Sequence, residues 1–209
     1  MNDGYIDSCI TSIITYLNKD LEELGKLKVA CFPIFASVNT GIEFVSGLLY
    51  GFKDPISGKP NSGSRFKEFF KNYMRKADSK YNKTNIPEYF YSFLRNKITH
   101  EAGIAGGFST ENSERYRDLH LKEHRIGGDK IVYIHPIEYR NDFLKALKFF
   151  EEDYHISSVK QHAIINFRKS CEESMKQLRK YPIDLPLVEG EPSTDGTNSK
   201  TLFITIARD

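Results

Sequence analysis

Residues 6–24 read IDSCITSIITYLNKDLEEL, and the spacing of the apolar side chains in this stretch decides the fold class. These side chains recur at every third or fourth position, at Ile6, Ile10, Ile13, Ile14, Leu17, Leu21 and Leu24. Because an α-helix has 3.6 residues per turn, this spacing places them on one face of a helix. Gly25 follows at once and is predicted to end that helix with a left-handed cap. The stretch therefore predicts a helix that packs on other helices through one face.

Three further segments repeat the same pattern. Pro33 suits the first turn of a second helix, whose apolar stripe is Ile34, Val38, Ile42, Val45, Leu49 and Phe52. A loop rich in Pro, Gly and Ser follows at residues 53–64. Ser64 can then cap a third helix, and Pro87 opens a fourth that runs toward the glycines near residue 105. We therefore predict a mainly α, up-and-down helical bundle.

The second half of the chain predicts a small β elaboration of this bundle. The segments DLHLKEHRI and KIVYIHP flank two glycines and an aspartate, which is the composition of a tight β-hairpin at about residues 117–135. We expect a bundle with this inserted hairpin over residues 1–155, an additional packing helix over 156–181, and a flexible arm over 182–209. The arm ends in TLFITI, residues 201–206, a predicted strand that requires a sheet edge from this chain or from a second copy.

Composition excludes several classes of protein. The chain has 209 residues, of which 39% are hydrophobic and 28% charged, so it can build a core. Its net charge of +2 gives no global argument for a nucleic-acid or membrane partner. The three cysteines have no C-x-x-C spacing, so neither a disulfide framework nor a zinc site is predicted. The apolar runs ACFPIFASV and VSGLLYGF are broken by Pro, Gly or polar residues well short of about 20 residues, so we expect a soluble cytoplasmic protein.

Positive charge is concentrated in one region of the chain. Residues 53–83 hold nine Lys or Arg residues against three acidic residues, a net charge of +6. The predicted third helix carries the five candidate substrate-binding residues Arg65, Lys67, Lys71, Arg75 and Lys76. Such a surface attracts phosphates through counterion release and predicts RNA as a partner. The alternative is a solvated helix face with no ligand.

The segment Arg95-Asn96-Lys97-Ile98-Thr99-His100 carries the predicted catalytic residues. In a helix, Asn96 and His100 lie one turn apart, and the long side chain of Arg95 can bend toward His100. A guanidinium binds a phosphate, an imidazole moves a proton near neutral pH, and an Asn amide orients either group. Together they can promote attack of a ribose 2′-hydroxyl on the adjacent phosphodiester, with His100 as general acid or base and no metal or cofactor required. In the alternative, Arg95 pairs with an acid such as Glu43 or Glu101, and His100 bonds a backbone carbonyl.

The segment YFYSFLRNKITH, residues 89–100, in the context of a helical bundle over about residues 5–155, resembles the HEPN superfamily. Its motif is Arg, four to six residues beginning with a polar one, then His, and Asn96 fills the polar place. The resemblance implies a homodimer in which two copies of Arg95, Asn96 and His100 face one cleft. It also implies a metal-independent endoribonuclease that serves toxin–antitoxin, abortive-infection or other defence systems, with a cognate antitoxin or defence partner. Many members are noncatalytic scaffolds that bind RNA, nucleotide or protein, and this is the alternative function.

Three histidines are candidate ligands of a metal ion. An alternating strand would place His120 and His124 on one face, with His135 beyond the hairpin. No Cys or set of carboxylates completes a coordination sphere around them. The sequence therefore predicts no metal site.

Overall fold

Helix α2 (Cys31–Tyr50) lies at the centre of the fold and contacts α1, α3, α6 and α7. The computed structural model describes residues 2–27, 31–54, 57–59, 61–96, 114–126 and 129–180. The other helices within these ranges are α1 (Asp3–Lys26), α3 (Ser62–Phe69), α4 (Arg75–Ala77), α5 (Ile86–Tyr89), α6 (Pro136–Tyr154) and α7 (Ser157–Leu178). The mainly α bundle predicted from the sequence is confirmed.

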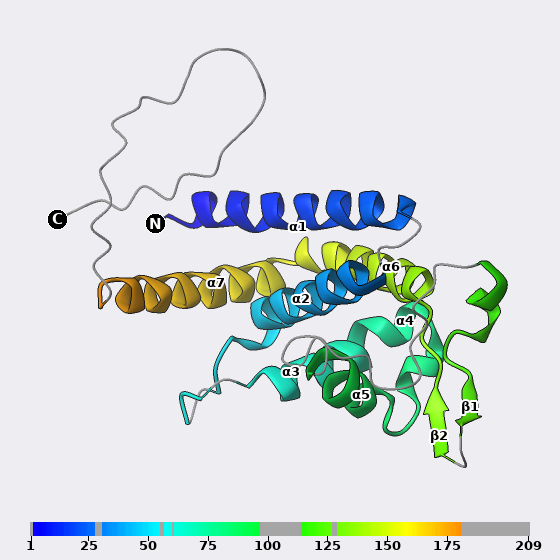
Figure 1. Cartoon of the computed structure of the whole chain (residues 1–209). Helices are drawn as coiled ribbons and strands as arrows, with labels where there is room; N and C mark the ends of the chain where they lie inside the picture. Colours follow the sequence, from blue (N-terminus) through cyan, green and yellow to red (C-terminus); the bar gives the residue numbers. More distant parts are fainter. Residues whose placement is uncertain are drawn as a thin grey trace.

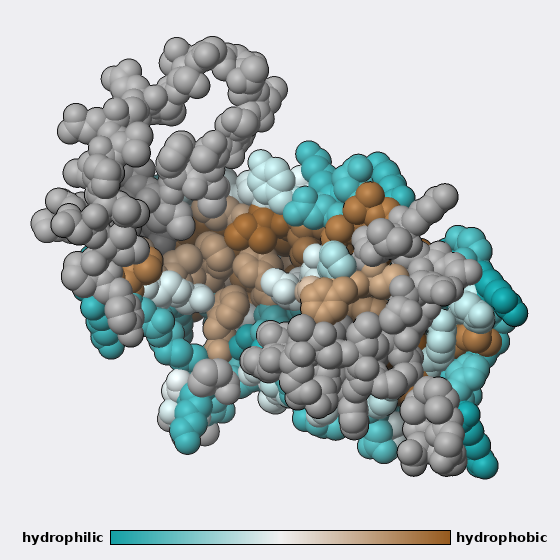
Figure 2. All heavy atoms as spheres, in the orientation of Figure 1, coloured by the Kyte–Doolittle hydropathy of each residue, from teal (hydrophilic) through white to brown (hydrophobic). Residues whose placement is uncertain are grey.

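The helices form three layers, which Figure 1 shows from the side. One layer is α1, which runs antiparallel to α2. The middle layer holds α2, α6 and α7, and α7 continues from the end of α6 in about the same direction, so that it lengthens the bundle. The third layer holds α3, α4 and α5. Apolar side chains are visible along the face where α1 and α2 lie, and hydrophilic side chains cover much of the remaining surface (Figure 2).

Helix α1 forms as the spacing of its apolar residues predicts, but it does not end as predicted. Its apolar face is buried at Ile6, Ile10, Ile14 and Leu21, and the side chain of Asn2 caps its first turn by accepting a hydrogen bond from the backbone N–H of Tyr5 at 2.8 Å. The helix passes through Gly25 and ends at Lys26, where the cap residue Leu27 is extended. The predicted left-handed cap at Gly25 is therefore wrong.

The glycine at position 25 has a packing role instead. A Cβ at this position would lie 1.0 Å from Nη1 of Arg140 on α6. The guanidinium of Arg140 thus occupies the space that any larger residue would fill, and its Nη1 lies 3.5 Å from the carbonyl oxygen of Leu21. Gly25 allows α6 to approach α1 at this point.

The Pro and Gly residues within the apolar runs of α2 do not break the predicted second helix. Pro33 lies in the first turn, where it breaks no hydrogen bond, and Gly41 and Gly47 remain helical. The two runs therefore join in one helix of 20 residues, which among the described residues is the single helix long and apolar enough to cross a membrane. More than half of that window is buried inside the bundle, as is typical of a core helix.

Two of the other helical segments contain a π-helical turn. The helix over residues 62–77 consists of α3, the π-helical turn η1 (Phe70–Met74) and α4. It begins at Ser62 and not at the predicted cap Ser64. The helix over residues 86–96 consists of α5 and the π-helical turn η3 (Phe90–Arg95), with Asn96 as its cap residue. Such turns are rare and are found at functional sites more often than elsewhere.

The predicted hairpin is confirmed over a shorter range. Strands β1 (Glu123–Ile126) and β2 (Asp129–Val132) pair antiparallel, with Glu123 opposite Val132 and Ile126 opposite Asp129. Residues 114–119 form a 3₁₀ helix where strand was expected. Helix α6 begins at Pro136, and α7 begins at Ser157, within the segment 156–181 that is predicted as an additional packing helix. The arm at residues 182–209 and its predicted strand lie outside the described residues.

Candidate functional site

The segment that carries the predicted catalytic residues packs against α2 and α3. Phe90 and Leu94 are fully buried in the core, and the hydroxyl of Tyr91 is hydrogen bonded to that of Ser62 at 3.0 Å. A Cβ at Gly63 would lie 2.9 Å from the Tyr91 ring, so the glycine allows the two helices to approach closely. These contacts fix the end of η3 beside α2.

Arg95 and Asn96 are brought together at this position. Nη1 of Arg95 donates a hydrogen bond to Oδ1 of Asn96 at 2.9 Å, and the guanidinium carbon lies 5.5 Å from the centre of the Tyr91 ring. Nε of Arg95 donates to Oε1 of Glu43 on α2 in a short ion pair. The Arg95 side chain is only 16% exposed. The pairing with Glu43, which the sequence offered as the alternative environment of Arg95, is thus present.

Arg65 lies behind this pair and not on the surface. Its Nη1 donates to the carbonyl oxygen of Phe52 at 2.8 Å and to Oδ1 of Asn61 at 3.0 Å, and its Nη2 lies 3.8 Å from Oε2 of Glu43. Burial lowers the pKa of the Arg65 guanidinium below its ordinary value, and the negative charge of Glu43 opposes this effect. Arg65 is therefore buried and not on the surface, and its assignment as a substrate-binding residue stays a prediction. Arg65 and Arg95 contact different oxygens of the Glu43 carboxylate.

A small pocket opens where α2 meets this segment. It has a volume of about 100 Å³ and is lined by Asn39, Thr40, Glu43 and Arg95. Asn39 is 3% exposed, and its Oδ1 accepts a hydrogen bond from the hydroxyl of Tyr139 at 2.9 Å. Its Nδ2 is buried and has no hydrogen-bond partner among the described residues. Sequence reasoning missed Asn39, although Asn39 and Glu43 stand one turn apart and are the one amide and the one charged side chain of α2, and this spacing could have indicated a polar site.

His100, the third predicted catalytic residue, lies outside the described residues, as do residues 97–113. The structure therefore describes the Arg95 and Asn96 part of the predicted site, together with Glu43 and Asn39 on α2.

The predicted basic surface on the third helix is partly neutralised. Three of its lysines form ion pairs: Lys67 with Glu88 at 2.7 Å, Lys71 with Glu68 at 2.7 Å and Lys76 with Asp153 at 3.6 Å. Arg75 is exposed beside them. The surface thus presents less net positive charge than the composition of residues 53–83 suggests.

Comparisons with protein-family models, with curated proteins and with solved structures find no match to this chain. The assignment to the HEPN superfamily thus stays a prediction from the motif.

A second buried polar cluster contains His120, one of the three candidate metal ligands. Nδ1 of His120 accepts a hydrogen bond from the backbone N–H of His135 at 3.1 Å, and its Nε2 lies 3.0 Å from the hydroxyl of Tyr81 and 3.4 Å from Oδ2 of Asp142. Both ring nitrogens are thus used within the fold. In the described part of the chain, no group of three or more His, Cys, Asp or Glu side chains could hold a metal ion.

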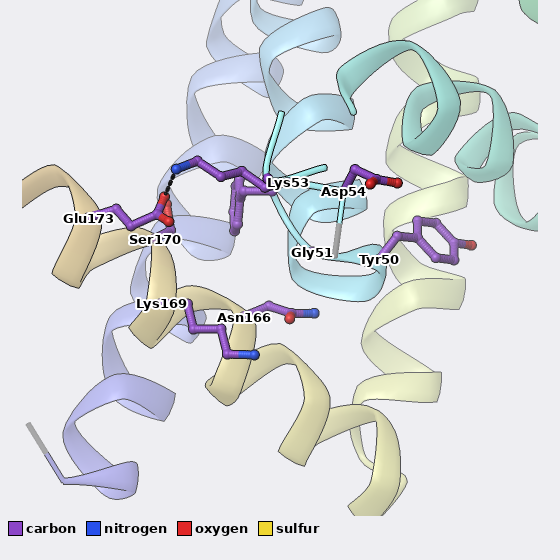
Figure 3. A pocket seen from close by; sticks show the side chains of 10 residues that line it. Tyr50, Gly51, Lys53, Asp54, Asn166, Lys169, Ser170 and Glu173 are labelled. Atoms are coloured by element: carbon purple, nitrogen blue, oxygen red, sulfur yellow. Dashed lines mark ion pairs between the residues drawn. The ribbon is translucent and has the colours of Figure 1, made fainter. Parts of the chain in front are cut away.

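A larger pocket, of about 280 Å³, lies between the end of α2 and α7 (Figure 3). Lys53 reaches Glu173 on α7 in an ion pair at 2.6 Å, and Asn166 caps α2 by donating to the carbonyl oxygen of Leu48 at 2.8 Å. None of the predicted site residues lines this pocket. The ion pair between Lys53 and Glu173 joins the segment after α2 to α7, which suits a role in holding these two parts of the bundle together.

Proposed function

We propose that the protein is a metal-independent endoribonuclease of the HEPN type, which acts in the cytoplasm as a homodimer. The observation that carries the proposal is the position of Arg95 beside Asn96, held by Glu43 at the mouth of a polar pocket. A guanidinium that is fixed before substrate arrives loses little side-chain entropy when it binds a phosphate.

In the proposed reaction, the ribose 2′-hydroxyl attacks the adjacent phosphorus and the 5′-oxygen of the next nucleotide leaves. His100 takes the proton from the 2′-hydroxyl or gives one to the leaving oxygen. Arg95 stabilises the extra negative charge on the phosphorus oxygens in the transition state. A phosphate oxygen that displaces Oδ1 of Asn96 from Nη1 of Arg95 exchanges a neutral acceptor for a charged one, which is the stronger bond.

The groups around Arg95 support this role. Glu43 lies between Arg65 and Arg95, so two positive charges flank one negative charge, and the cluster as a whole keeps a positive charge for phosphate. The exposed Arg75, on the same helical segment as Arg65, adds positive charge that steers RNA, and Lys67, Lys71 and Lys76 contribute less because each is paired with an acidic residue. A nuclease of this kind fits a toxin–antitoxin, abortive-infection or stress-response setting, with an antitoxin or defence protein as its partner.

A second candidate function is that of a noncatalytic scaffold that binds RNA, nucleotide or another protein. The observation that favours it is the ion pair between Arg95 and Glu43, which already engages the guanidinium. Under this function Arg95 and Asn96 contribute to binding alone, and no substrate bond is broken.

Incubation of the purified chain with single-stranded RNA in EDTA separates the two functions. The nuclease is expected to cleave RNA in the chelator, and His100→Ala is expected to abolish cleavage. The matched control is His162→Ala, because His162 is exposed on α7 and its Nδ1 is hydrogen bonded to the Ser158 carbonyl of its own helix. RNA that stays intact with the unmodified chain at every protein concentration supports the scaffold instead.

A further inference from the structure

We propose that the pocket lined by Asn39, Thr40, Glu43 and Arg95 binds a sugar hydroxyl of the nucleotide whose phosphate Arg95 contacts. This inference rests on the proposed function and extends it, because it assigns to α2 the residues that distinguish ribose from deoxyribose.

The first argument is the unsatisfied amide of Asn39. The side chain is 3% exposed, yet Nδ2 has no hydrogen-bond partner in the described part of the protein. A buried N–H without a partner is unfavourable, so such groups are rare unless water or a ligand satisfies them. Because the neighbouring positions Val38 and Ile42 are apolar and fully buried, the polar residue at position 39 calls for an explanation beyond packing.

The second argument is that the orientation of this amide is fixed. Tyr139 is fully buried, and its hydroxyl donates to Oδ1 of Asn39 at 2.9 Å. Burial raises the pKa of Tyr139 well above its ordinary value, so the phenol keeps its proton and remains a donor. The ring of Tyr139 is itself held, with its centre 5.0 Å from that of Phe90 and 6.1 Å from that of Phe35. With Oδ1 bound to Tyr139, the Nδ2 group remains available for another acceptor.

The third argument is the size and chemistry of the pocket. Its volume of about 100 Å³ is well above the roughly 10–15 Å³ that one water-sized group requires, so it can hold a hydroxyl on the edge of a sugar. Nδ2 of Asn39 is a donor, the carboxylate of Glu43 is an acceptor, and the exposed hydroxyl of Thr40 is both. The group that satisfies a donor and an acceptor together is a hydroxyl.

The position beside Arg95 identifies which hydroxyl is meant. Arg95 lines the same pocket, so a phosphate on its guanidinium places the attached sugar at the pocket entrance. Ribose carries a hydroxyl next to the phosphate, whereas deoxyribose lacks the 2′-hydroxyl and leaves the pocket groups without a partner. Sites built to bond a hydroxyl discriminate strongly against analogues that lack it.

The test is a comparison of RNA and DNA binding in full-length protein carrying His100→Ala, which prevents cleavage. The probes are a labelled single-stranded RNA and the DNA of the same sequence, measured by fluorescence anisotropy in EDTA. We expect RNA to bind about tenfold more tightly than DNA, the effect of one or two hydrogen bonds. Adding Asn39→Leu should lower the affinity for RNA to that for DNA and leave the affinity for DNA within about twofold.

A second variant keeps the test decisive if Asn39→Leu does not fold. Thr40→Val removes an exposed hydroxyl from the pocket and should reduce the ratio of RNA to DNA affinity about threefold. Its matched control is Thr15→Val on α1, which removes an exposed hydroxyl that donates to the Thr11 carbonyl of its own helix and should leave the ratio unchanged. Equal affinities for RNA and DNA before mutation, or a ratio that survives both pocket variants, would overturn the inference.

The inference and the proposed function fail in different ways. Cleavage of RNA by the unmodified chain together with an unchanged ratio in the pocket variants removes the hydroxyl site and leaves the nuclease. A ratio that depends on Asn39, together with no cleavage, removes the nuclease and leaves a ribonucleotide-binding scaffold.

Discussion

Asp142, on α6, accepts hydrogen bonds from three side chains. The hydroxyl of Tyr81 donates to Oδ2 at 3.2 Å, Nζ of Lys145 donates to Oδ1 at 3.1 Å, and Nε2 of His120 lies 3.4 Å from Oδ2. Because the backbone N–H of His135 donates to Nδ1 of His120, the proton of the neutral ring resides on Nε2, facing Asp142 and Tyr81. One carboxylate thus joins α6 to residue 81 and to the turn before β1.

The free energy of unfolding should depend on this carboxylate in acid. Burial by itself raises the pKa of Asp142, but hydrogen bonds from His120 and Lys145 outweigh it, so the pKa lies below its ordinary value. The stabilisation is therefore complete above the unfolded pKa of about 3.9 and is lost as the pH falls through the folded pKa. At pH 7, Asp142→Asn should lower the free energy of unfolding by about 1–3 kcal/mol, and this difference should shrink toward pH 3.

Urea unfolding from pH 3 to pH 7 measures this effect. Asp20→Asn is the control, because Asp20 is exposed on α1, and its free energy of unfolding should follow that of the unmodified chain at every pH. An Asp142→Asn deficit that is as large at pH 3 as at pH 7 would contradict the assigned role of the carboxylate.

Single residues were predicted well where their role is local. Arg95 and Asn96 are adjacent in sequence, and both are predicted members of one polar site, although the hydrogen bond between them is not part of that prediction. Glu43 was named only as one of two acids that could pair with Arg95, because 52 positions separate the two residues. Asn39 and Tyr139 are 100 positions apart, and no sequence pattern relates them. Contacts of this kind depend on which helix faces meet, and helical periodicity alone does not determine that.

Gly41 determines how closely three helices approach one another. A Cβ at this position would lie 2.7 Å from Cζ of Phe143 on α6 and 2.9 Å from Cδ2 of Leu17 on α1. Phe143 is fully buried and cannot move without displacing other core residues. The glycine is therefore required by packing, although it is a poor helix former.

Gly41→Ala should destabilise the protein despite the better helix propensity of alanine. The gain in propensity is about 1 kcal/mol, whereas overpacking of a core costs about 1–3 kcal/mol, so we expect a net loss of roughly 1 kcal/mol. Gly4→Ala is the matched control, because Gly4 is exposed in α1 and the nearest atom to its Cβ, Oδ1 of Asn2, is 3.6 Å away. Guanidinium unfolding should show a lower midpoint for the first variant and an equal or higher midpoint for the second. A stabilised Gly41→Ala protein would show that α1 and α6 can move apart.

The helices themselves could be predicted because their apolar residues repeat with the helical period. Their irregular features could not. Gly25 has the usual identity of a helix cap but serves to admit the Arg140 side chain. The π-helical turns η1 and η3 lie within aromatic stretches that fit an ordinary helix equally well by spacing. A π-helical turn places subsequent side chains differently from the 100° rotation per residue used to align Asn96 with His100.

At the scale of the whole molecule, ion pairs with acidic residues reduce the positive charge that the composition of the third helix indicates. Acidic residues neutralise three of the lysines on the third helix, and one of these, Asp153, belongs to α6. Arg75 is exposed in α4. If RNA binds this surface, the number of counterions that it releases should be smaller than the number of basic residues in the sequence.

The salt dependence of RNA binding tests this surface. Arg75→Ala should weaken binding and lower the slope of log affinity against log salt by about 0.7, the contribution of one phosphate contact on a single strand. Lys26→Ala should leave the slope unchanged, because Lys26 lies at the end of α1 and pairs with Glu23 at 2.5 Å. Anisotropy titrations at several salt concentrations give both slopes, and equal slopes for Arg75→Ala and the unmodified chain would place the RNA on another surface.

The central position of α2 has a consequence for the order in which the molecule opens. Because α2 contacts α1, α3, α6 and α7, the backbone amides of its buried face are shielded from solvent on several sides and open only when these neighbours separate. Deuterium should therefore enter α2 last, at a rate set by complete unfolding. The final turns of α7, where Leu178 is 52% exposed, should exchange by local fraying within a much shorter time.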